Sequence, residues 1–320
     1  MTVAQGDVFA LSNFGAYVSN QTDEIAGIYN IVDGFVEVQV ADASLLSGAA
    51  AVTANGTGGS SSTADTMNMS VLNVAATIDG MDGDDIITGT DYGDTIEGGD
   101  GTDTYVASGG TAISVTLNTS TDAIVTVTGG ANDTIVNVEN VTGTSGDDTI
   151  VGDSAANTIV GAGGADTLTG AAGDDIIDLG SAAGDADTVV NADIDNNGTD
   201  SITNFTTSVD DIELSVADLN AITSAVDFTA GETVGTVGST DNGAFVEFVD
   251  GGGNVAASAT VGTFIYNADT GELIFDAVGD TTYDDTTGAV TDSAGDDIVF
   301  ADLGTGASGD IVAADLTLIA

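Results

Sequence analysis

The sequence predicts an all-β protein built around a parallel β-solenoid, or β-roll, flanked by N- and C-terminal β-sandwich-like modules. Three observations predict this class. Seven nine-residue units carry glycine, aspartate and an apolar residue at fixed places. The segments outside these units alternate apolar and polar residues, as strands do. The chain has 45 glycines and no proline, and 42% of its residues are hydrophobic, so it has enough apolar material to fold.

Changes in composition predict the order of the parts. A Gly/Ser-rich stretch, NGTGGSSSTAD, is typical of a linker or a long loop and separates an N-terminal module from the repeats. That module is a candidate for self-association or partner binding. The predicted parts are the N-terminal β module (1–54), the linker (55–65), the solenoid (66–190, with repeat runs at 80–106 and 143–178) and a C-terminal β module (191–320).

Strands are predicted outside the repeats by alternation. In FVEVQV (35–40), Val36, Val38 and Val40 share one face. The segment 111–153, which leads from the first run into the second, alternates in the same way. Within 263–280, two alternating runs surround the turn sequence N-A-D-T-G, which predicts a hairpin.

The repeats have the form G-x-x-G-x-D-x-(apolar)-x. The first run reads GMDGDDIIT, GTDYGDTIE and GGDGTDTYV, and the second reads GTSGDDTIV, GDSAANTIV, GAGGADTLT and GAAGDDIID. Two units make one coil of a solenoid, so units 18 residues apart are expected to stack on one edge and to share a metal. The expected pairs are Asp85 with Asp103, Asp148 with Asp166, and Asn157 with Asp175.

These turns have the chemistry of a calcium site. The glycines permit a tight turn with backbone carbonyls directed at an ion, and the aspartate supplies a carboxylate. We expect several calcium ions. The predicted metal-site residues are Gly80, Asp82, Asp85, Asp94, Gly98, Asp100, Gly101, Asp103, Gly143, Gly146, Asp148, Asn157, Gly161, Gly163, Asp166, Gly173, Asp175 and, in the solitary repeat-like unit 294–302, Asp297.

Two units depart from the pattern. Tyr92 and Ala155 stand where the other units have glycine, and neutral Asn157 replaces aspartate. Sites built from these units are expected to be weaker or empty. The alternative for the whole array is a Gly/Asp repeat that forms solenoid corners without metal, but stacked carboxylates would then repel one another at close range.

The charge of the chain excludes many functions. It contains 52 Asp and Glu but no Lys, Arg, His or Cys, giving a formal charge of −52 that opposes compaction unless cations screen or bind it. The chain offers no imidazole or thiolate for zinc, no haem ligand, no Ser-His or Cys-His couple, no disulfide and no electrostatic route to nucleic acid. The sequence contains no run of 18 apolar residues, so it predicts no transmembrane segment. Only a two-carboxylate glycosidase stays formally possible, so no enzyme is expected.

The nonapeptides resemble the calcium-binding repeats of the RTX (repeats-in-toxin) family. The resemblance extends to ENVTGT before the second run, to residues 195–215 and 263–280, and to the terminal SGDIVAADLTLIA, which is similar to an uncleaved export signal. It implies a calcium-binding β-roll exported by type I secretion machinery. It also implies a place outside or on the surface of a Gram-negative-type bacterium, reached without a cleaved N-terminal signal.

Together these features favour an extracellular, calcium-dependent structural protein that self-assembles into a surface layer or filament. Its expected partners are calcium, copies of itself, the type I secretion machinery and a cell-surface polysaccharide. The alternative is an RTX-type adhesin or carbohydrate-binding module that acts as a soluble monomer. An RTX-borne metalloprotease or lipase would need the histidine that this chain lacks. Adaptation to molar salt would explain surface acidity but not aspartates spaced by glycine.

Overall fold

The computed structural model describes the repeat region almost throughout, at residues 64–70, 74–118, 122–180, 185–191 and 198–217. Elsewhere it describes strands and short segments, at 8–11, 27–31, 36–40, 51–55, 219, 235–236, 245–249, 263–267, 271–276, 282–284, 289–291, 298–303 and 315–319. Asp297 and most of the Gly/Ser-rich linker lie outside them. No helix within the described residues is long and apolar enough to cross a membrane.

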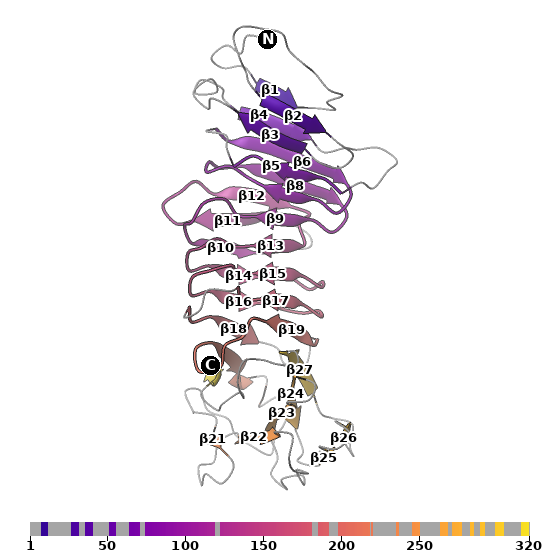
Figure 1. Cartoon of the computed structure of the whole chain (residues 1–320), viewed down its shortest axis with the longest axis vertical. Coiled ribbons are helices and arrows are strands. Elements are labelled where there is room, and N and C mark those ends of the chain that lie inside the picture. The colour runs from indigo at the N-terminus through magenta and orange to yellow at the C-terminus, as the bar shows by residue number, and fades with distance from the viewer. Residues whose placement is uncertain are drawn as a thin grey trace. The chain divides into compact units, whose positions relative to one another are not determined.

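The chain divides into two compact units, Met1–Ile150 and Val151–Ala320. In the first unit the chain passes between two sheets (Figure 1). One sheet contains, in spatial order, β1 (Val8–Leu11), β4 (Ala51–Asn55), β6 (Ala76–Asp82), β8 (Thr95–Asp100), β12 (Asp133–Val136), β11 (Ala123–Val127), β10 (Ile113–Thr116) and β14 (Thr149–Val151). The other contains β2 (Gly27–Ile31), β3 (Val36–Val40), β5 (Thr66–Asn68), β7 (Ile86–Thr88), β9 (Thr104–Val106) and β13 (Asn140–Thr142).

The register of the repeat strands follows the nonapeptide length. β7 pairs in parallel with β9, placing Ile87 opposite Tyr105, and β6 pairs in parallel with β8, placing Ile78 opposite Ile96. Each of these pairs joins residues 18 apart, which is one coil of two nonapeptides. Their side chains are at most 1% exposed and fill the space between the sheets. The predicted all-β fold with parallel, stacked coils is confirmed.

An antiparallel excursion separates the two repeat runs. β10 pairs antiparallel with β11, and β11 pairs antiparallel with β12. β12 then returns to the solenoid, where Ile135 lies opposite Ile96 on β8 in a parallel pair. The strands predicted within 111–153 are therefore present.

The strands that precede the linker extend both sheets of the first unit. β3 pairs in parallel with β5, and β4 pairs in parallel with β6. The strand predicted at 35–40 is β3, which confirms the alternation there. The boundaries of an N-terminal module (1–54) stay a prediction, because the described part of this segment consists of strands alone.

The second unit also has two sheets. One contains β16 (Thr167–Thr169), β18 (Thr188–Asn191), β20 (Asp211–Ser215) and β28 (Leu316–Ile319), all parallel. The other contains β15 (Thr158–Val160), β17 (Ile176–Asp178), β19 (Asp200–Thr203), β27 (Ile298–Asp302), β24 (Glu272–Asp276), β23 (Thr263–Asn267), β22 (Phe245–Val249) and β21 (Gly235–Thr236). β25 (Thr282–Asp284) and β26 (Ala289–Thr291) form a separate hairpin.

Aromatic residues build the core beside β24. β23 and β24 form the hairpin that the sequence predicts within 263–280, with Tyr266 opposite Leu273. The ring of Phe264 lies 5.0 Å from that of Phe275 and 6.1 Å from that of Phe300, measured between centroids, and all three are fully buried.

Candidate metal centre

Each nonapeptide forms a turn that ends in a buried polar residue, followed at once by a short strand. The side chains of Asp85, Asp103 and Asp175 are 1%, 0% and 1% exposed. Equally placed and also buried are Asp94, Asp148, Asn157 and Asp166. Aspartate is almost never buried without a partner, so these positions need one.

The first partner is the backbone of the stacked coil. The N–H of Asp85 donates to Oδ1 of Asp103 at 2.8 Å, and the N–H of Asn157 donates to Oδ1 of Asp175 at 2.7 Å. Two of the three predicted stacked pairs therefore lie side by side. Asp148 and Asp166 fall in different units, so their pairing stays a prediction.

The second carboxylate oxygen is the unusual feature of the site. Oδ2 of Asp85, Asp103 and Asp175 is buried and accepts no hydrogen bond from the described residues. Leaving a buried acceptor without a donor costs about 1–3 kcal/mol, and more if it is charged. The chain has no Lys, Arg or His to supply a charge. The compensating cation must therefore come from solution.

The first glycine of each turn makes room for this oxygen. A Cβ at Gly98 would lie 2.5 Å from Oδ2 of Asp103, and one at Gly80 would lie 2.4 Å from Oδ2 of Asp85. Both distances are far shorter than a van der Waals contact. The same arrangement occurs at Gly89, Gly152, Gly161 and Gly170, each of which faces the Asp or Asn five residues later. Glycine is thus required here by close approach to the carboxylate.

Backbone carbonyls supply further oxygen atoms between stacked turns. The carbonyl oxygens of Met81 and Gly83 lie 2.0 Å from the positions that Cβ atoms of Gly99 and Gly101 would take. Both glycines have positive φ, +120° and +151°. No three Asp or Glu side chains converge in the described part of the chain. An ion here would therefore be held by one or two carboxylates and by carbonyl oxygens, a donor set that calcium prefers.

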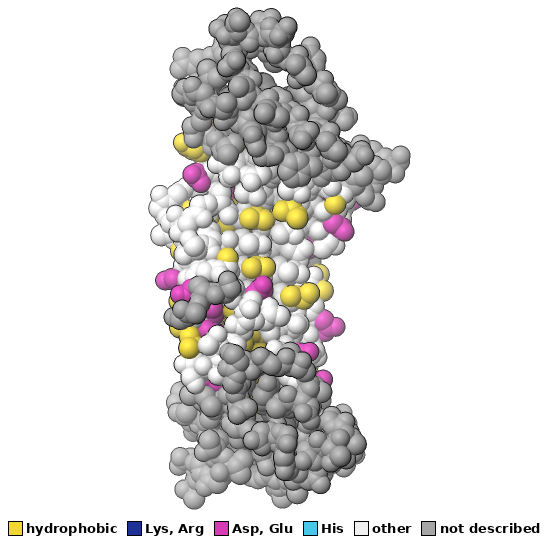
Figure 2. Space-filling view, viewed as in Figure 1, with side chains coloured by type: hydrophobic (Ala, Val, Ile, Leu, Met, Phe, Trp, Pro, Cys, Tyr) yellow, Lys and Arg dark blue, Asp and Glu magenta, His cyan; other side chains and the backbone are white. Residues whose placement is uncertain are grey.

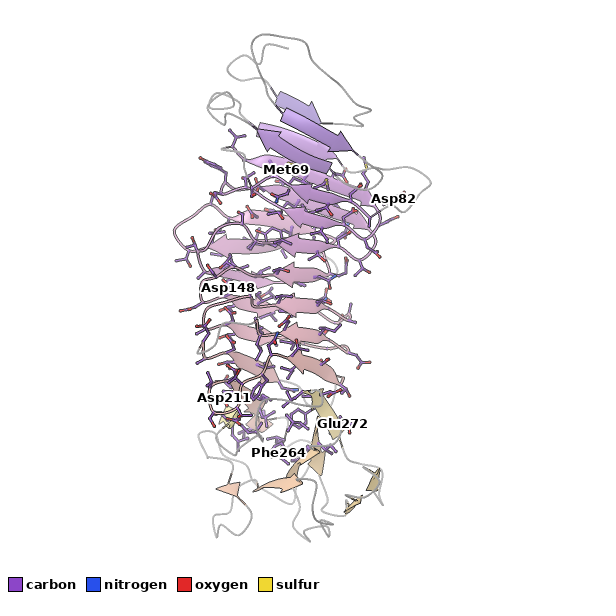
Figure 3. All side chains as sticks on the ribbon, viewed as in Figure 1. Met69, Asp82, Asp148, Asp211, Phe264 and Glu272 are labelled. Atoms are coloured by element: carbon purple, nitrogen blue, oxygen red, sulfur yellow. The ribbon has the colours of Figure 1, made fainter. Side chains whose placement is uncertain are left out.

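The other predicted site residues surround these turns. Asp82 and Asp100 lie opposite each other on β6 and β8, half-buried and exposed respectively, and Figure 3 shows Asp82 at the edge of the sheets. Gly143 is buried, and a Cβ at Gly146 would lie 2.5 Å from the nitrogen of Ala112. Gly173 has a φ of +126°.

In the unit GAGGADTLT, Gly164 has positive φ, at +108°. The predicted site residue Gly163 precedes it, and its part in a metal site stays a prediction. Gly164 corresponds to Gly83, Gly101 and Gly173 in the other units.

Sequence reasoning missed buried aspartates outside the nonapeptides. Asp200 accepts the N–H of Asp175 at 3.1 Å, and Asp187 accepts the N–H of Asp166 at 2.9 Å. Among the buried aspartates outside the nonapeptides are Asp65, Asp133, Asp187, Asp200 and Asp210. Each stands two residues before a buried apolar residue of a short strand, so the shorter pattern D-x-(apolar) would have found them.

Burial makes these carboxyl groups weak acids in the absence of a cation. It raises the pKa of Asp103 to about 7 and that of Asp85 to about 6, against the opposing effect of the backbone hydrogen bond that each accepts. Burial likewise raises the pKa of Asp175 to about 6. A bound divalent cation would favour the ionised form instead.

Comparison with known families agrees with this geometry. A family model for the RTX calcium-binding nonapeptide repeat matches residues 79–111 and 140–181, with four copies. The chain carries RTX calcium-binding repeats. RTX repeats bind Ca²⁺, so calcium is the cofactor, as predicted. The buried aspartates with unpaired oxygens are the residues of this chain that fit it.

One solved structure illustrates how far the likeness extends. The crystal structure of the extracellular lipase LipA from Serratia marcescens is similar at 13% identity and a TM-score of 0.22, covering 84% of this chain and 40% of that chain. A likeness at this TM-score supports no argument about activity. The RTX-repeat chain thus spans less than half of that lipase structure. The comparison with curated proteins found no match to this chain.

Proposed function

We propose that this RTX-repeat protein is an extracellular structural protein that folds on binding calcium and then assembles with its own copies into a surface layer or filament. The unpaired Oδ2 atoms of Asp85, Asp103 and Asp175 carry the proposal. They lie in a chain with no basic side chain to neutralise them. Calcium is therefore required for folding and does not merely bind to a fold that has already formed.

A structural role agrees with how the acidic groups are used. The buried carboxylates accept hydrogen bonds from backbone N–H groups of stacked coils, as Asp103 does from Asp85 and Asp133 does from Asp94. On the described face in Figure 2, the remaining acidic side chains lie mostly along the margins of the sheets, and aliphatic side chains lie between them. A catalytic site needs unlike groups that converge, and RTX repeats are generally non-catalytic.

The ends of the sheets offer surfaces for assembly. β1 and β2 are the outermost strands of the two sheets in the first unit, and no other described strand pairs with their outer edges. Such an edge is a template for pairing with another chain. Two copies of charge −52 repel each other until cations bind or screen that charge. Calcium would therefore control assembly as well as folding.

Calcium concentration would also separate the site of synthesis from the site of action. Extracellular calcium modules bind at about 10⁻⁴–10⁻³ M, so the chain would stay unfolded and exportable inside the cell. RTX repeats are typical of extracellular, type I-secreted proteins. The acidic and apolar terminal sequence SGDIVAADLTLIA is our candidate for the export signal, and a cell-surface polysaccharide is a candidate anchor.

Negative-stain electron microscopy of the purified chain tests this function. Ordered sheets or filaments should form in about 1 mM calcium, the range of extracellular modules, and should be absent in chelator. Discrete monomers in both conditions would contradict assembly and favour an adhesin. Magnesium at equal ionic strength is the control for simple screening of the negative charge, because Mg²⁺ retains its water ligands and is seldom bound by protein oxygens alone.

A further inference from the structure

The nonapeptide turns fall into two classes that differ at the residue four places before the final Asp or Asn. In the first class this residue has positive φ. The angle is +81° at Met81, +120° at Gly99 and +76° at Ala171. We call these turns open: they are 80–85, 98–103, 170–175 and, with Ala162 at +77°, 161–166. Asp85, Asp103 and Asp175, which end three of them, are the residues with unpaired Oδ2 atoms.

In the second class this residue closes the turn by donating a hydrogen bond to the side chain of the final Asp or Asn. The N–H of Thr90 donates to Oδ2 of Asp94 at 2.5 Å, and the Thr90 hydroxyl donates to Oδ1 at 2.9 Å. Thr144 donates to Asp148 in the same way, at 2.6 and 3.2 Å. In the third closed turn, 152–157, the N–H of Asp153 donates to Oδ1 of Asn157 at 2.8 Å. None of the three donor residues has positive φ.

The class of a turn decides what its carboxylate can bind. Oδ1 of Asp94 also accepts the N–H of Ala76, at 2.6 Å, so both oxygens of this carboxylate are held by donors inside the protein. Three donors thus already occupy most of the roughly four lone-pair sites of this carboxylate, and calcium would have to compete with them. In the open turns that end at Asp85, Asp103 and Asp175, the buried Oδ2 faces the first glycine of its own turn and has no donor to lose.

We propose that calcium occupies the open turns only, and that the closed turns are metal-free corners held by hydrogen bonds. This inference rests on the calcium binding on which the proposed function depends, and it assigns that binding to particular turns. The nonapeptide pattern alone does not make the distinction. The turn at 143–148 keeps both glycines and the aspartate of the motif, yet Thr144 closes it.

The assignment puts calcium on one edge of the first unit. Both of its open turns lead from one sheet to the other in the same direction, from β6 to β7 and from β8 to β9. Its closed turns lead back, from β7 to β8 and from β13 to β14. Figure 3 shows Asp82, of an open turn, and Asp148, of a closed turn, on opposite sides of the sheets.

Matched substitutions of the full chain test the assignment. Asp85→Asn and Asp175→Asn alter open turns, and Asp94→Asn and Asp148→Asn alter closed turns. Bound calcium is counted by equilibrium dialysis in about 0.15 M salt, which screens weak binding at the surface, and folding is checked by circular dichroism. We expect the open-turn variants to bind at least one ion fewer than the unaltered chain and the closed-turn variants to bind the same number.

An equal loss of ions from both classes would overturn the assignment and leave calcium binding intact. An unaltered chain that binds no calcium would instead contradict the proposed function. If the asparagine variants fail to fold, Thr144→Gly provides a second test, because it removes the Thr144 hydroxyl donor and lets this position adopt the positive φ of the open turns. It should gain an ion, the matched control Thr144→Ser should not, and equal counts in these two variants would overturn the proposal.

Discussion

The backbone N–H of Asp85 donates a 2.8 Å hydrogen bond to Oδ1 of Asp103, the equivalent residue one coil later. Asp103 thus joins two coils with one oxygen and keeps the other, Oδ2, inside its own turn beside Gly98. The same side chain therefore sets the stacking of the coils and creates a need for a cation. Folding and calcium binding are coupled through this one group.

Gly98→Ala should destabilise the protein strongly. The added Cβ would lie 2.0 Å from the carbonyl oxygen of Asn137 and 2.5 Å from Oδ2 of Asp103, so backbone and carboxylate must both move. We expect a loss of about 1–3 kcal/mol, as for other overpacked sites. The melting temperature in saturating calcium measures it.

The matched control is Gly129→Asn. Gly129 has a φ of +73°, which Asn tolerates, and a Cβ there would meet no atom within 4 Å. The melting temperature should change little. Equal losses in the two variants would contradict this account, because an added Cβ meets close atoms at Gly98 alone.

Mild acid should stabilise the calcium-free chain. Burial raises the pKa of Asp103 to about 7 and that of Asp85 to about 6, above the value of about 3.9 expected in the unfolded chain. Between about pH 4 and 7 the folded state therefore binds more protons, and its free energy of unfolding falls as pH rises. In chelator, the fraction of folded chain measured by circular dichroism should therefore be higher at about pH 5 than at about pH 8.

The calcium-loaded chain should show the reverse trend. Protons compete with calcium for the same carboxylates, so acid weakens binding and lowers the urea midpoint. A folded fraction of the calcium-free chain that rises with pH would contradict the account of the buried aspartates.

Tyr105→Phe should destabilise the first unit. The Tyr105 hydroxyl donates a 2.6 Å hydrogen bond to Oδ2 of Asp133, and both side chains are buried. Removing the donor leaves a buried carboxylate oxygen unpaired, at a cost of about 1–3 kcal/mol. Tyr92→Phe is the control, because Tyr92 is 43% exposed. Equal melting temperatures for the two variants would show that the buried hydrogen bond contributes nothing.

Much of this fold could be predicted from the sequence because each nonapeptide carries its own local signals. The apolar residue two places after Asp85 or Asp175 enters the core, and the unit length fixes the stacking of Asp85 on Asp103. The hairpin of β23 and β24 was likewise predicted by alternation around a turn.

The features that escaped prediction depend on contacts between coils or on backbone angles. The pattern D-x-(apolar) marks Asp133 as a buried aspartate, but its pairing with the N–H of Asp94 arises only because the antiparallel excursion returns it beside that residue. The closing of the turn at Asp148 depends on the φ angle of Thr144, which the glycine pattern does not encode. The pairing of β3 and β4 with the solenoid strands involves segments separated by the linker.

Hydrogen exchange measured by mass spectrometry tests the central claim most directly. The claim is that calcium completes the fold of the repeats. Backbone amides of the repeats, such as those of Asp85 and Asn157, donate hydrogen bonds to buried carboxylates of the stacked coil. Amides within 80–106 and 143–178 should be protected in about 1 mM calcium and should exchange rapidly in chelator. Equal protection in both conditions would contradict the claim, since the repeats would then fold without the ion.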